Sequence, residues 1–196
     1  MLFQPDNPTR YRIVGIDPGS NTLGACALDV DLVTRDIVLL DARTFDANDL
    51  IRSYPNVVQW HGERVARLMA HEDTLFGYFS YIQPHSIISE SPYMGRFPQA
   101  FAALTECLTA IRRAVLRYDD FKPLLLVDPP TAKLAVGVKG KGSVKDDVKQ
   151  GVLSLRNLLN PDNIDIQNLD EHSIDAIAVA MSRAKFILDN LDKPTF

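Results

Sequence analysis

The sequence predicts an α/β protein in which helices flank a mixed sheet of five strands. Short apolar stretches rich in valine, isoleucine and leucine alternate with longer amphipathic segments along the 196 residues. The first three apolar stretches follow one another across short connections, as in an antiparallel meander. The later ones are separated by helical patterns, as in a sheet that is covered by helices.

The first strand is predicted at residues 12–17, where a run of β-branched residues ends at Asp17. Pro18 and Gly19 follow it and are typical of a tight turn, because proline presets φ and glycine allows a positive φ. The strand therefore places one carboxylate at its tip. An Asp-Pro-Gly sequence on its own is more often a capped turn, so the functional interpretation depends on the other acids of the chain.

Two more strands complete the predicted meander. Residues 23–30 alternate and carry small side chains, and residues 37–45 form a further apolar run. Residues 45–55 are predicted to be a loop, because the acidic and amide residues there favour turns. The chain is therefore expected to leave the sheet at this point, before a long helix begins.

A long amphipathic helix is predicted at residues 56–82. Apolar residues recur there mostly at steps of three and four, and Pro84 follows the last of them. His61 and His71 are expected on its solvated face, without a functional role. A second helix is predicted at residues 98–118, where several alanines accompany the apolar stripe. Such small side chains allow close packing against a sheet or against a twin helix.

The fourth and fifth strands are predicted at residues 86–90 and 124–128, on either side of the second helix. Both are short and apolar, and both end on an acid that a proline or a Ser-Pro pair follows. These acids are Glu90 and Asp128. The pattern repeats that of the opening strand, so Asp17 and Glu90 are expected at neighbouring strand ends, on one edge of the sheet.

A lysine-rich segment at residues 131–150 follows the fifth strand. Three glycines break it, which predicts a flexible basic loop that leads into a helix at residues 143–159. The alternative is a solvated loop without a ligand. The lysines of this segment include Lys133, Lys139, Lys141 and Lys145.

The last helix is predicted to begin at Asn168 and to carry its apolar stripe as far as residue 186. Asn168 and Glu171 have the spacing of a capping box, with Asn168 as the N-cap. His172 and Asp175 are three residues apart, so they share one face of this helix. The first turns of the helix can therefore present both side chains to the same site.

Asp17, Glu90 and Asp175, with His172 beside the last, are the candidates for a metal site. Carboxylates that converge at one sheet edge repel each other unless cations bind them. Oxygen-rich sites of this kind suit Mg²⁺ or Mn²⁺. Two such ions about 3.5–4 Å apart form a clamp for in-line displacement at a phosphodiester. For any one of these acids alone, a capping or solvated role is the simpler interpretation.

Composition and length limit the class of protein. An apolar share of 46% and a charged share of 23% are ordinary for a globular chain. No apolar run reaches the roughly 18 residues of a membrane span, and no membrane partner is expected. Residues 1–10 are predicted to form a loose N-terminal arm, and residues 11–196 a single domain. The two cysteines lack metal-type spacing, so reduced thiols and a cytoplasmic location are expected, in a cell or for a viral protein in its host.

Three stretches resemble the acidic motifs of the RuvC family of Holliday junction resolvases. They are residues 15–20 (GIDPGS), with Gly24 close behind, residues 88–94 (ISESPYM) and residues 172–178 (HSIDAIA). The resemblance covers about residues 12–186 in the family's order, with the basic segment in between. It implies an RNase H-like (ribonuclease H superfamily) fold for the predicted five-stranded sheet and its helices.

The resemblance also implies roles for the four candidate residues. Asp17, Glu90, His172 and Asp175 would be catalytic and would hold two Mg²⁺ ions, with Mn²⁺ as a substitute. Part of the family has aspartate where His172 stands, so histidine is a known variant of the pattern. It would either ligate one of the ions or help to activate the attacking water.

Nucleic-acid contacts follow from the same resemblance. Tyr93 stands where the family has an aromatic residue that stacks on opened bases at the crossover, and stacking of this kind is worth about 1–3 kcal/mol per base. Its alternative is a tyrosine packed at a strand exit. Lys133 and Lys145 match phosphate-contacting lysines, and Lys139 and Lys141 belong to a lengthened loop between them. The net charge of −4 favours such a local basic patch over binding across the whole surface.

The leading functional prediction is a homodimeric Mg²⁺-dependent endonuclease that nicks two opposed strands of a four-way DNA junction in recombination, repair or DNA processing. A related alternative is a RuvC-like or YqgF-like nuclease that acts on other branched DNA or on RNA. A nucleotide-binding fold of the actin and sugar-kinase type needs a second domain, for which 196 residues leave no room. An inactive DNA-binding module would gain nothing from mutually repelling carboxylates.

Overall fold

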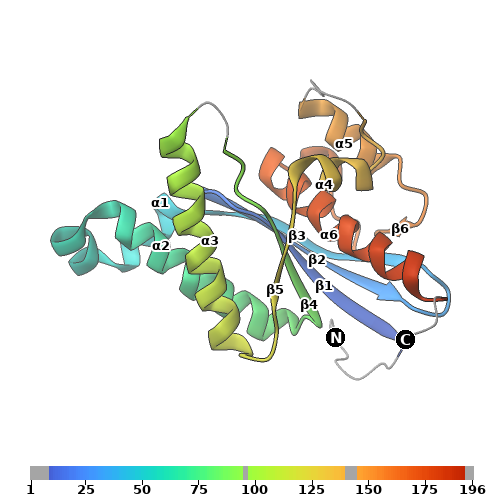
Figure 1. Ribbon diagram of the computed structural model, residues 1–196, viewed down its shortest axis with the longest axis horizontal. Helices are drawn as coiled ribbons and strands as arrows, with labels where there is room; N and C mark the ends of the chain where they lie inside the picture. The colour runs from blue at the N-terminus through green and yellow to red at the C-terminus, as the bar shows by residue number, and fades with distance from the viewer. Residues whose placement is uncertain (1–8, 95–96, 140–144, 193–196) are drawn as a thin grey trace.

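The computed structural model describes residues 9–94, 97–139 and 145–192. Within these residues one mixed sheet of six strands forms the centre, in the order β5-β4-β1-β2-β3-β6. Helices cover both of its faces (Figure 1). The predicted class, an α/β protein with a mixed sheet between helices, is confirmed, whereas the predicted number of strands, five, is wrong.

The predicted antiparallel meander is formed by β1 (Arg10–Asp17), β2 (Thr22–Asp31) and β3 (Ile37–Asp46). Its first two strands are buried along most of their length, since helices lie on both sides of the sheet. Most of the expected N-terminal arm, residues 1–8, lies outside the described part of the chain. Arg10, which was assigned to that arm, is already paired in β1.

The remaining strands are parallel to their neighbours. β4 (Ser86–Glu90) pairs with β1, and β5 (Leu124–Val127) pairs with β4. The sixth strand, β6 (Leu158–Leu159), pairs with the start of β3 at the opposite edge of the sheet. This strand was missed because its leucines continue the helical spacing of the preceding segment.

The helix predicted at residues 143–159 is therefore shorter than expected. The described helix is α5 (Lys145–Leu153). It ends where Ser154 Oγ donates a hydrogen bond to the carbonyl oxygen of Gly151 at 2.8 Å, which satisfies one of the carbonyls at the end of the helix. The chain is then free to turn back towards the sheet edge and form β6.

One face of the sheet is covered by α2 (Pro55–Ile82) and α3 (Pro98–Tyr118), close to their predicted bounds. Each begins with proline in its first turn, where no backbone donor is needed. The buried cluster on this face includes Val14, Ile16, Leu23, Leu75, Phe79, Cys107 and Ile111. Ala114 of α3 belongs to it, and Ala110 of the same helix is also buried within the protein itself.

The other face is covered by α5, α6 (Glu171–Asn190) and α4 (Pro129–Ala135). The first part of the predicted basic loop is thus helical. Asp128 is the N-cap of α4, since its carboxylate accepts hydrogen bonds from the Thr131 backbone nitrogen at 3.0 Å and hydroxyl at 2.7 Å. The buried cluster on this face includes Ile13, Leu28, Leu39, Val152, Ile174, Ile177 and Met181.

The N-cap of α6 is Asp170, and not Asn168 as the sequence indicated. The Asp170 carboxylate accepts a hydrogen bond from the backbone nitrogen of Ser173 at 2.9 Å and another from the Thr44 hydroxyl at 2.6 Å. Asn168 instead lies in a short 3₁₀ helix and donates to the Asp165 carboxylate. Asn168 and Asp170 are both acceptable capping residues, and the hydrogen bond from Thr44 of β3 favours Asp170.

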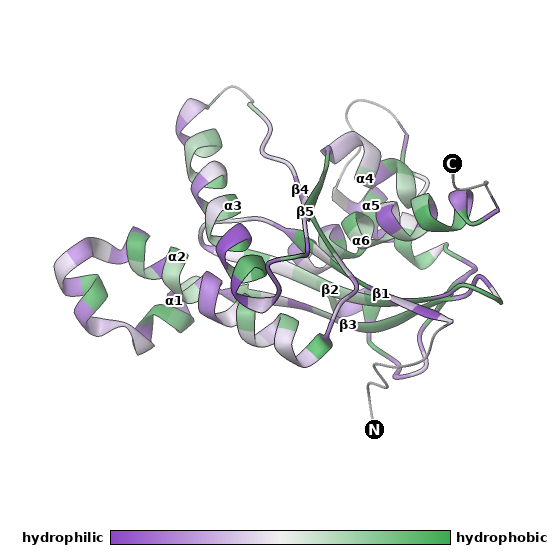
Figure 2. Cartoon of the chain, turned by 60° about the horizontal axis from the view of Figure 1, so that its bottom comes forward, coloured by the Kyte–Doolittle hydropathy of each residue, from purple (hydrophilic) through white to green (hydrophobic). Residues whose placement is uncertain are grey.

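The predicted loop at residues 45–55 is also helical. It contains α1 (Ala47–Leu50) and a single 3₁₀ turn (Ile51–Ser53), with Asp46 as the N-cap of α1. Gly62 then interrupts α2 with a positive φ of 82°. The part of α2 before this break stands apart from the sheet, as Figure 1 and Figure 2 both show.

The two histidines of α2 differ in their surroundings. His61 is exposed, as expected for the solvated face, but His71 is fully buried, so its predicted exposure is wrong. His71 lies three residues after Leu68 and four before Leu75, so it shares the apolar face of α2 that packs against the sheet. No helix within the described residues is long and apolar enough to cross a membrane.

Candidate active site

β1 and β4 bring Asp17 and Glu90 to one edge of the sheet. The two strands are parallel neighbours in which Ile16 lies opposite Ser89. The acid that follows each of these residues therefore lies at the same level, at the carboxyl end of the sheet. This is the edge where open α/β sheets bind their ligands.

Glycines allow α6 to approach this edge closely. A side chain on Gly15 would collide with the backbone of α6 at Ala176, and one on Gly24 would collide with the backbone of His172. The first turns of α6 therefore rest directly on β1 and β2. Gly19 serves the turn in a similar way: its φ is not positive, but a side chain there would meet the carbonyl oxygen of Thr22.

His172 is held by a hydrogen bond at each ring nitrogen. Its Nδ1 lies 2.7 Å from a carboxylate oxygen of Asp17, and its Nε2 lies 2.7 Å from the hydroxyl oxygen of Thr22. The hydrogen bond to Asp17 raises the pKa of His172 above its ordinary value. Burial raises the pKa of Asp17, and the same hydrogen bond offsets part of that rise. The pair thus fixes the orientation of both side chains.

Glu90 and Asp175 have raised pKa values for a shared reason. Burial raises the pKa of Glu90 to about 7, and the charges of Asp17 and Asp175 add to the rise. Burial likewise raises the pKa of Asp175 to about 6, with further contributions from Asp17 and Glu171. Among the described residues, no hydrogen bond or ion pair compensates the carboxylate of Glu90 or that of Asp175. The site is therefore a group of half-buried acids short of positive charge.

This donor set fits a divalent cation by its chemistry. Carboxylate oxygens are the ligands that Mg²⁺ and Mn²⁺ prefer, and a cation would offset both the burial and the repulsion that raise these pKa values. Within the described residues no three histidine, cysteine or acidic side chains already stand at the spacing of a metal site. Both nitrogens of His172 are engaged by Asp17 and Thr22, so the carboxylates of Asp17, Glu90 and Asp175 are the ligands that fit without breaking an existing bond.

Lys133 is the lysine that the structure places beside these acids. It lies in α4, and its charge lowers the pKa of both Glu90 and Asp175 against the effect of burial. Together with Asp175 it lines a cavity of 260 Å³ between α4, α5 and α6. The predicted basic segment therefore begins next to the candidate site.

The other predicted nucleic-acid contacts are only partly described. Tyr93 follows β4, and 72% of it is exposed, so its ring is available to a ligand and is not packed at the strand exit. Lys139 is exposed after α4. Lys141 lies outside the described residues, as does the side chain of Lys145, so their predicted phosphate contacts stay predictions.

Thr22 is a site residue that sequence reasoning missed. Its hydroxyl joins His172 to the start of β2, which pairs with the end of β1 that carries Asp17. The signal for it was weak, because a threonine at a strand start is common. The register of the meander pairs Asp17 with Gly24, and Thr22 lies two residues before Gly24, next to the turn that follows the acid.

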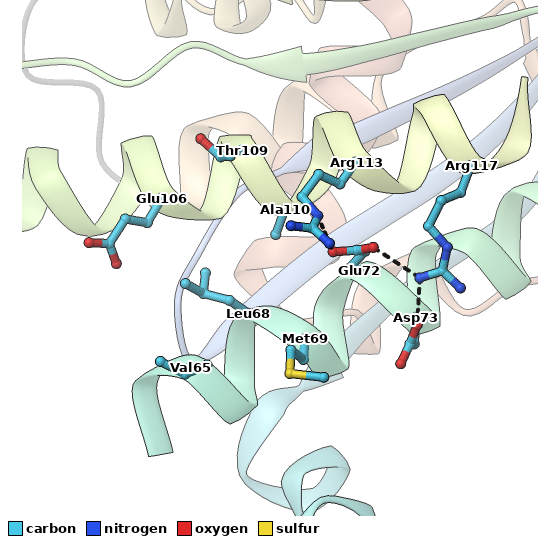
Figure 3. Close-up of a pocket in the computed structure, with 10 residues that line it drawn as sticks. All are labelled: Val65, Leu68, Met69, Glu72, Asp73, Glu106, Thr109, Ala110, Arg113 and Arg117. Carbon is cyan, nitrogen blue, oxygen red and sulfur yellow. Dashed lines mark hydrogen bonds and ion pairs between the residues drawn. The ribbon is translucent and has the colours of Figure 1, made fainter. Parts of the chain in front are cut away.

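A separate hollow lies between α2 and α3, on the other face of the sheet (Figure 3). It has a volume of 520 Å³. Glu72 lies at its centre and forms ion pairs with Arg113 at 2.8 Å and Arg117 at 3.0 Å. Val65, Leu68 and Met69 form its apolar wall. None of the acids at the strand ends lines this hollow, so it is not part of the candidate active site.

Comparison with solved structures finds the same fold in Holliday junction resolvases. RuvC of Thermus thermophilus matches with a TM-score of 0.66 at 18% identity, over 94% of this chain and 99% of that one. The yeast mitochondrial Holliday junction resolvase matches with a TM-score of 0.62 at 14% identity, over 97% and 86%. The fowlpox virus resolvase, solved with its substrate Holliday junction DNA, matches with a TM-score of 0.55 at 14% identity, over 90% and 99%.

Sequence comparison adds no relative to these structures. No protein-family model matches the chain, and no curated protein sequence matches it. At identities below 25% the structural likeness establishes the fold alone. The chain therefore has the RNase H-like α/β fold of RuvC-like resolvases, with a sixth strand, β6, at the edge of its sheet.

Proposed function

We propose that this protein is a metal-dependent endonuclease that resolves four-way DNA junctions. The observation that carries the proposal is the group of acids Asp17, Glu90 and Asp175 at the carboxyl edge of a resolvase-like sheet, of which Glu90 and Asp175 have no compensating hydrogen bond or ion pair among the described residues. A purely structural cluster would gain stability from amides or apolar residues at these positions. Acids whose burial and mutual repulsion raise the pKa of Asp175 to about 6 and that of Glu90 to about 7 instead favour a site that is completed by divalent cations.

The carboxylates would hold two Mg²⁺ ions, with Mn²⁺ as a substitute, and these would supply the activation of water and the stabilisation of charge on the phosphodiester. Other residues of the chain hold the Asp17 carboxylate in position. His172 holds a proton on Nδ1 in its bond to Asp17, which keeps that carboxylate directed to the sheet edge. Thr22 fixes the imidazole from the other side, so the ring can neither rotate nor exchange its partner easily.

DNA would be held by the residues around this edge. The ammonium group of Lys133 would contact a phosphate near the acids, and Lys139, Lys141 and Lys145 would extend the contact along the backbone. The exposed ring of Tyr93 would stack on a base that the junction leaves unpaired. Stacking of this kind favours a junction centre over an intact duplex, which gives selectivity without reading base edges.

We further propose that the active form is a homodimer. A four-way junction has two-fold symmetry, and its resolution needs one nick on each of two opposed strands. Two copies related by a two-fold axis provide two identical sites in the matching arrangement. α3 is the surface that we assign to this contact, since it lies on the face of the sheet away from α6 and carries the exposed Leu116.

The test is cleavage of labelled four-way junction, Y-fork, linear duplex and RNA, with Mg²⁺ and with EDTA. We expect paired nicks in the junction alone, and none with EDTA. The matched control is Asp17→Asn, which keeps the size of the side chain and removes its charge; we expect it to bind junction DNA normally and to lose cleavage. Cleavage of forks or RNA in place of junctions would favour the alternative nuclease, and binding without cleavage by the wild type would favour an inactive module.

A further inference from the structure

We propose that His71 and Cys107, from two different helices, are positioning residues that hold the turn after Asp17 and thereby set the geometry of the metal-binding carboxylate. The inference rests on the proposed function, since it concerns how that site is kept in shape. Neither residue belongs to the acidic motifs. His71 lies in α2 and Cys107 in α3, both on the face of the sheet opposite α6.

The two side chains reach consecutive carbonyl groups of one turn. His71 Nε2 lies 3.3 Å from the carbonyl oxygen of Ser20, and the Cys107 thiol donates a hydrogen bond to the carbonyl oxygen of Gly19 at 3.4 Å. These are the second and third residues after Asp17. The carboxylate and the turn are therefore too close in the chain to move independently.

The imidazole of His71 and the thiol of Cys107 can both donate a hydrogen bond to these carbonyl oxygens. A carbonyl oxygen only accepts hydrogen bonds, so Nε2 of His71 must carry a hydrogen. Its Nδ1 has no hydrogen-bond partner among the described residues, although the side chain is fully buried. Burial also raises the pKa of Cys107 to about 12, so its thiol keeps the hydrogen that it donates.

A buried imidazole with one unpartnered nitrogen is a poor choice for packing alone. An apolar side chain of similar size would fill the space without burying a polar atom that lacks a partner. The hydrogen bond to Ser20 is what such a side chain could not supply. The position of His71 is therefore better explained by the turn than by the core.

The turn is consequently held by hydrogen bonds from both faces of the sheet. On the α6 side, Thr22 bonds to His172, which in turn bonds to Asp17. On the α2–α3 side, His71 and Cys107 hold the carbonyls of Ser20 and Gly19. The polypeptide around the carboxylate has little freedom, which is what an undistorted two-cation site requires.

The test compares buried cysteines that differ in this one contact. Cys107→Ala removes the donor, Cys107→Ser restores it with a hydroxyl, and Cys26→Ala is the matched control, since Cys26 is equally buried but belongs to the cluster on the other face. The measurement is Mn²⁺ binding without DNA, followed by the electron paramagnetic resonance signal of the free ion. We expect Mn²⁺ to bind about three- to tenfold more weakly to Cys107→Ala, near normally to Cys107→Ser, and normally to Cys26→Ala.

A second pair tests the histidine. We expect His71→Leu to weaken Mn²⁺ binding by a similar factor and His71→Gln, whose amide can still donate to Ser20, to recover part of it. Thermal unfolding of each variant separates this effect from a loss of stability, because a merely structural residue would lower the unfolding temperature and leave the Mn²⁺ affinity of the folded protein unchanged. Unchanged affinity in both Cys107→Ala and His71→Leu would overturn the inference. If the wild type itself binds no Mn²⁺, the proposed function fails instead.

Discussion

Glu90 is a half-buried acid with other acids beside it, and its pKa is raised. Its pKa is raised to about 7 by burial and by the negative charges of Asp17 and Asp175. In the unfolded chain the same carboxyl group would titrate at its ordinary value of about 4.3. The folded protein therefore binds an extra proton between these two pH values, and folding is disfavoured as that proton is lost.

We expect the Glu90 carboxyl group to lower the stability of the metal-free protein as the pH rises from about 4.5 to 7.5, whereas His71 and His85, whose pKa values burial lowers, act in the opposite direction. The sign follows from the raised pKa: below the unfolded value both states are protonated, and above the folded value the buried site must carry its charges. For Glu90 the loss is on the order of 2 kcal/mol after allowance for solvent screening. The measurement is urea denaturation as a function of pH in EDTA.

The matched control for this pH dependence is Glu90→Gln, which should flatten the profile. Saturating Mg²⁺ should flatten it as well, because a bound cation replaces the proton as the source of compensation. A Glu90→Gln protein with the same pH profile as the wild type in EDTA would contradict the account of Glu90 as a buried acid without compensation.

At the scale of elements, a buried ion pair joins β1, β2 and α2. The Arg12 guanidinium donates two hydrogen bonds to the Asp29 carboxylate, at 2.7 and 3.0 Å, and a third to the carbonyl oxygen of Ile82 at the end of α2, at 2.8 Å. Arg12 and Asp29 face each other in the register of the hairpin and are almost fully buried. Removing one partner would leave a buried charge uncompensated.

We expect Asp29→Ala to lower the free energy of unfolding by about 3 kcal/mol, a typical cost for breaking a buried pair. The double variant Arg12→Met/Asp29→Leu should lose much less, since apolar residues of similar volume need no compensation. Urea denaturation at one pH measures both. Equal losses in the single and the double variant would mean that the cost comes from packing and not from the charge.

The elements that could be predicted from sequence are those with a strong local signal. β1 and β4 follow from runs of β-branched residues that end at an acid, and α3 from its apolar stripe and Pro98. β6 could not be foreseen, because Leu158 and Leu159 have helical spacing and become a strand only by pairing with β3.

The residues of the candidate site also fall into those that a local sequence pattern indicates and those that it does not. Asp17 and Glu90 stand out in the sequence because each ends a strand, and Asp175 because it follows His172 in the first turns of a helix, whereas Thr22 and His71 become meaningful only through contacts across the fold. The prediction for His71 was wrong because it followed the polar character of the side chain and not its spacing from Leu68 and Leu75, which places it on the apolar face. Hydrogen bonds between distant segments depend on packing, and no local pattern encodes them.

At the scale of the whole molecule, a chain with a net charge of −4 must concentrate its positive charge to bind DNA. Lys133 lies beside the acids, and the predicted basic segment follows it. We expect Lys133→Ala/Lys145→Ala to weaken binding to every DNA shape and to reduce the salt dependence by about one log unit per lost phosphate contact. Fluorescence anisotropy at several salt concentrations measures the slope.

The matched control for the lysine pair is Lys122→Ala. Lys122 forms an ion pair with Asp119 at 2.7 Å before the start of β5, and the candidate site lies at the other end of that strand. Its removal should leave the salt slope unchanged. An unaltered slope in the double variant would mean that the basic segment is only a solvated surface.

The proposed dimer needs an exposed apolar surface on α3, and the burial of its side chains shows which part of the helix can provide one. Ala110 and Ala114 are buried within the protein, so these alanines do not remain for a twin helix. Leu116 on the same helix is 59% exposed.

We expect wild-type protein to sediment as a dimer at micromolar concentration and Leu116→Asp to sediment as a monomer. Leu153→Asp, at a partly exposed leucine of α5 on the opposite face, is the control and should remain dimeric.

The pattern of nicks in a four-way junction gives a second test of the same dimer. In a mixture of wild-type and Asp17→Asn chains, each mixed dimer has one active site, so it should nick one strand of a junction and leave the opposed strand intact. Leu116→Asp protein, as a monomer, should lose the pairing of the two nicks while its carboxylates remain in place. A wild-type protein that is monomeric both alone and on junction DNA would contradict the two-fold arrangement, because independent monomers have no reason to cut opposed strands together.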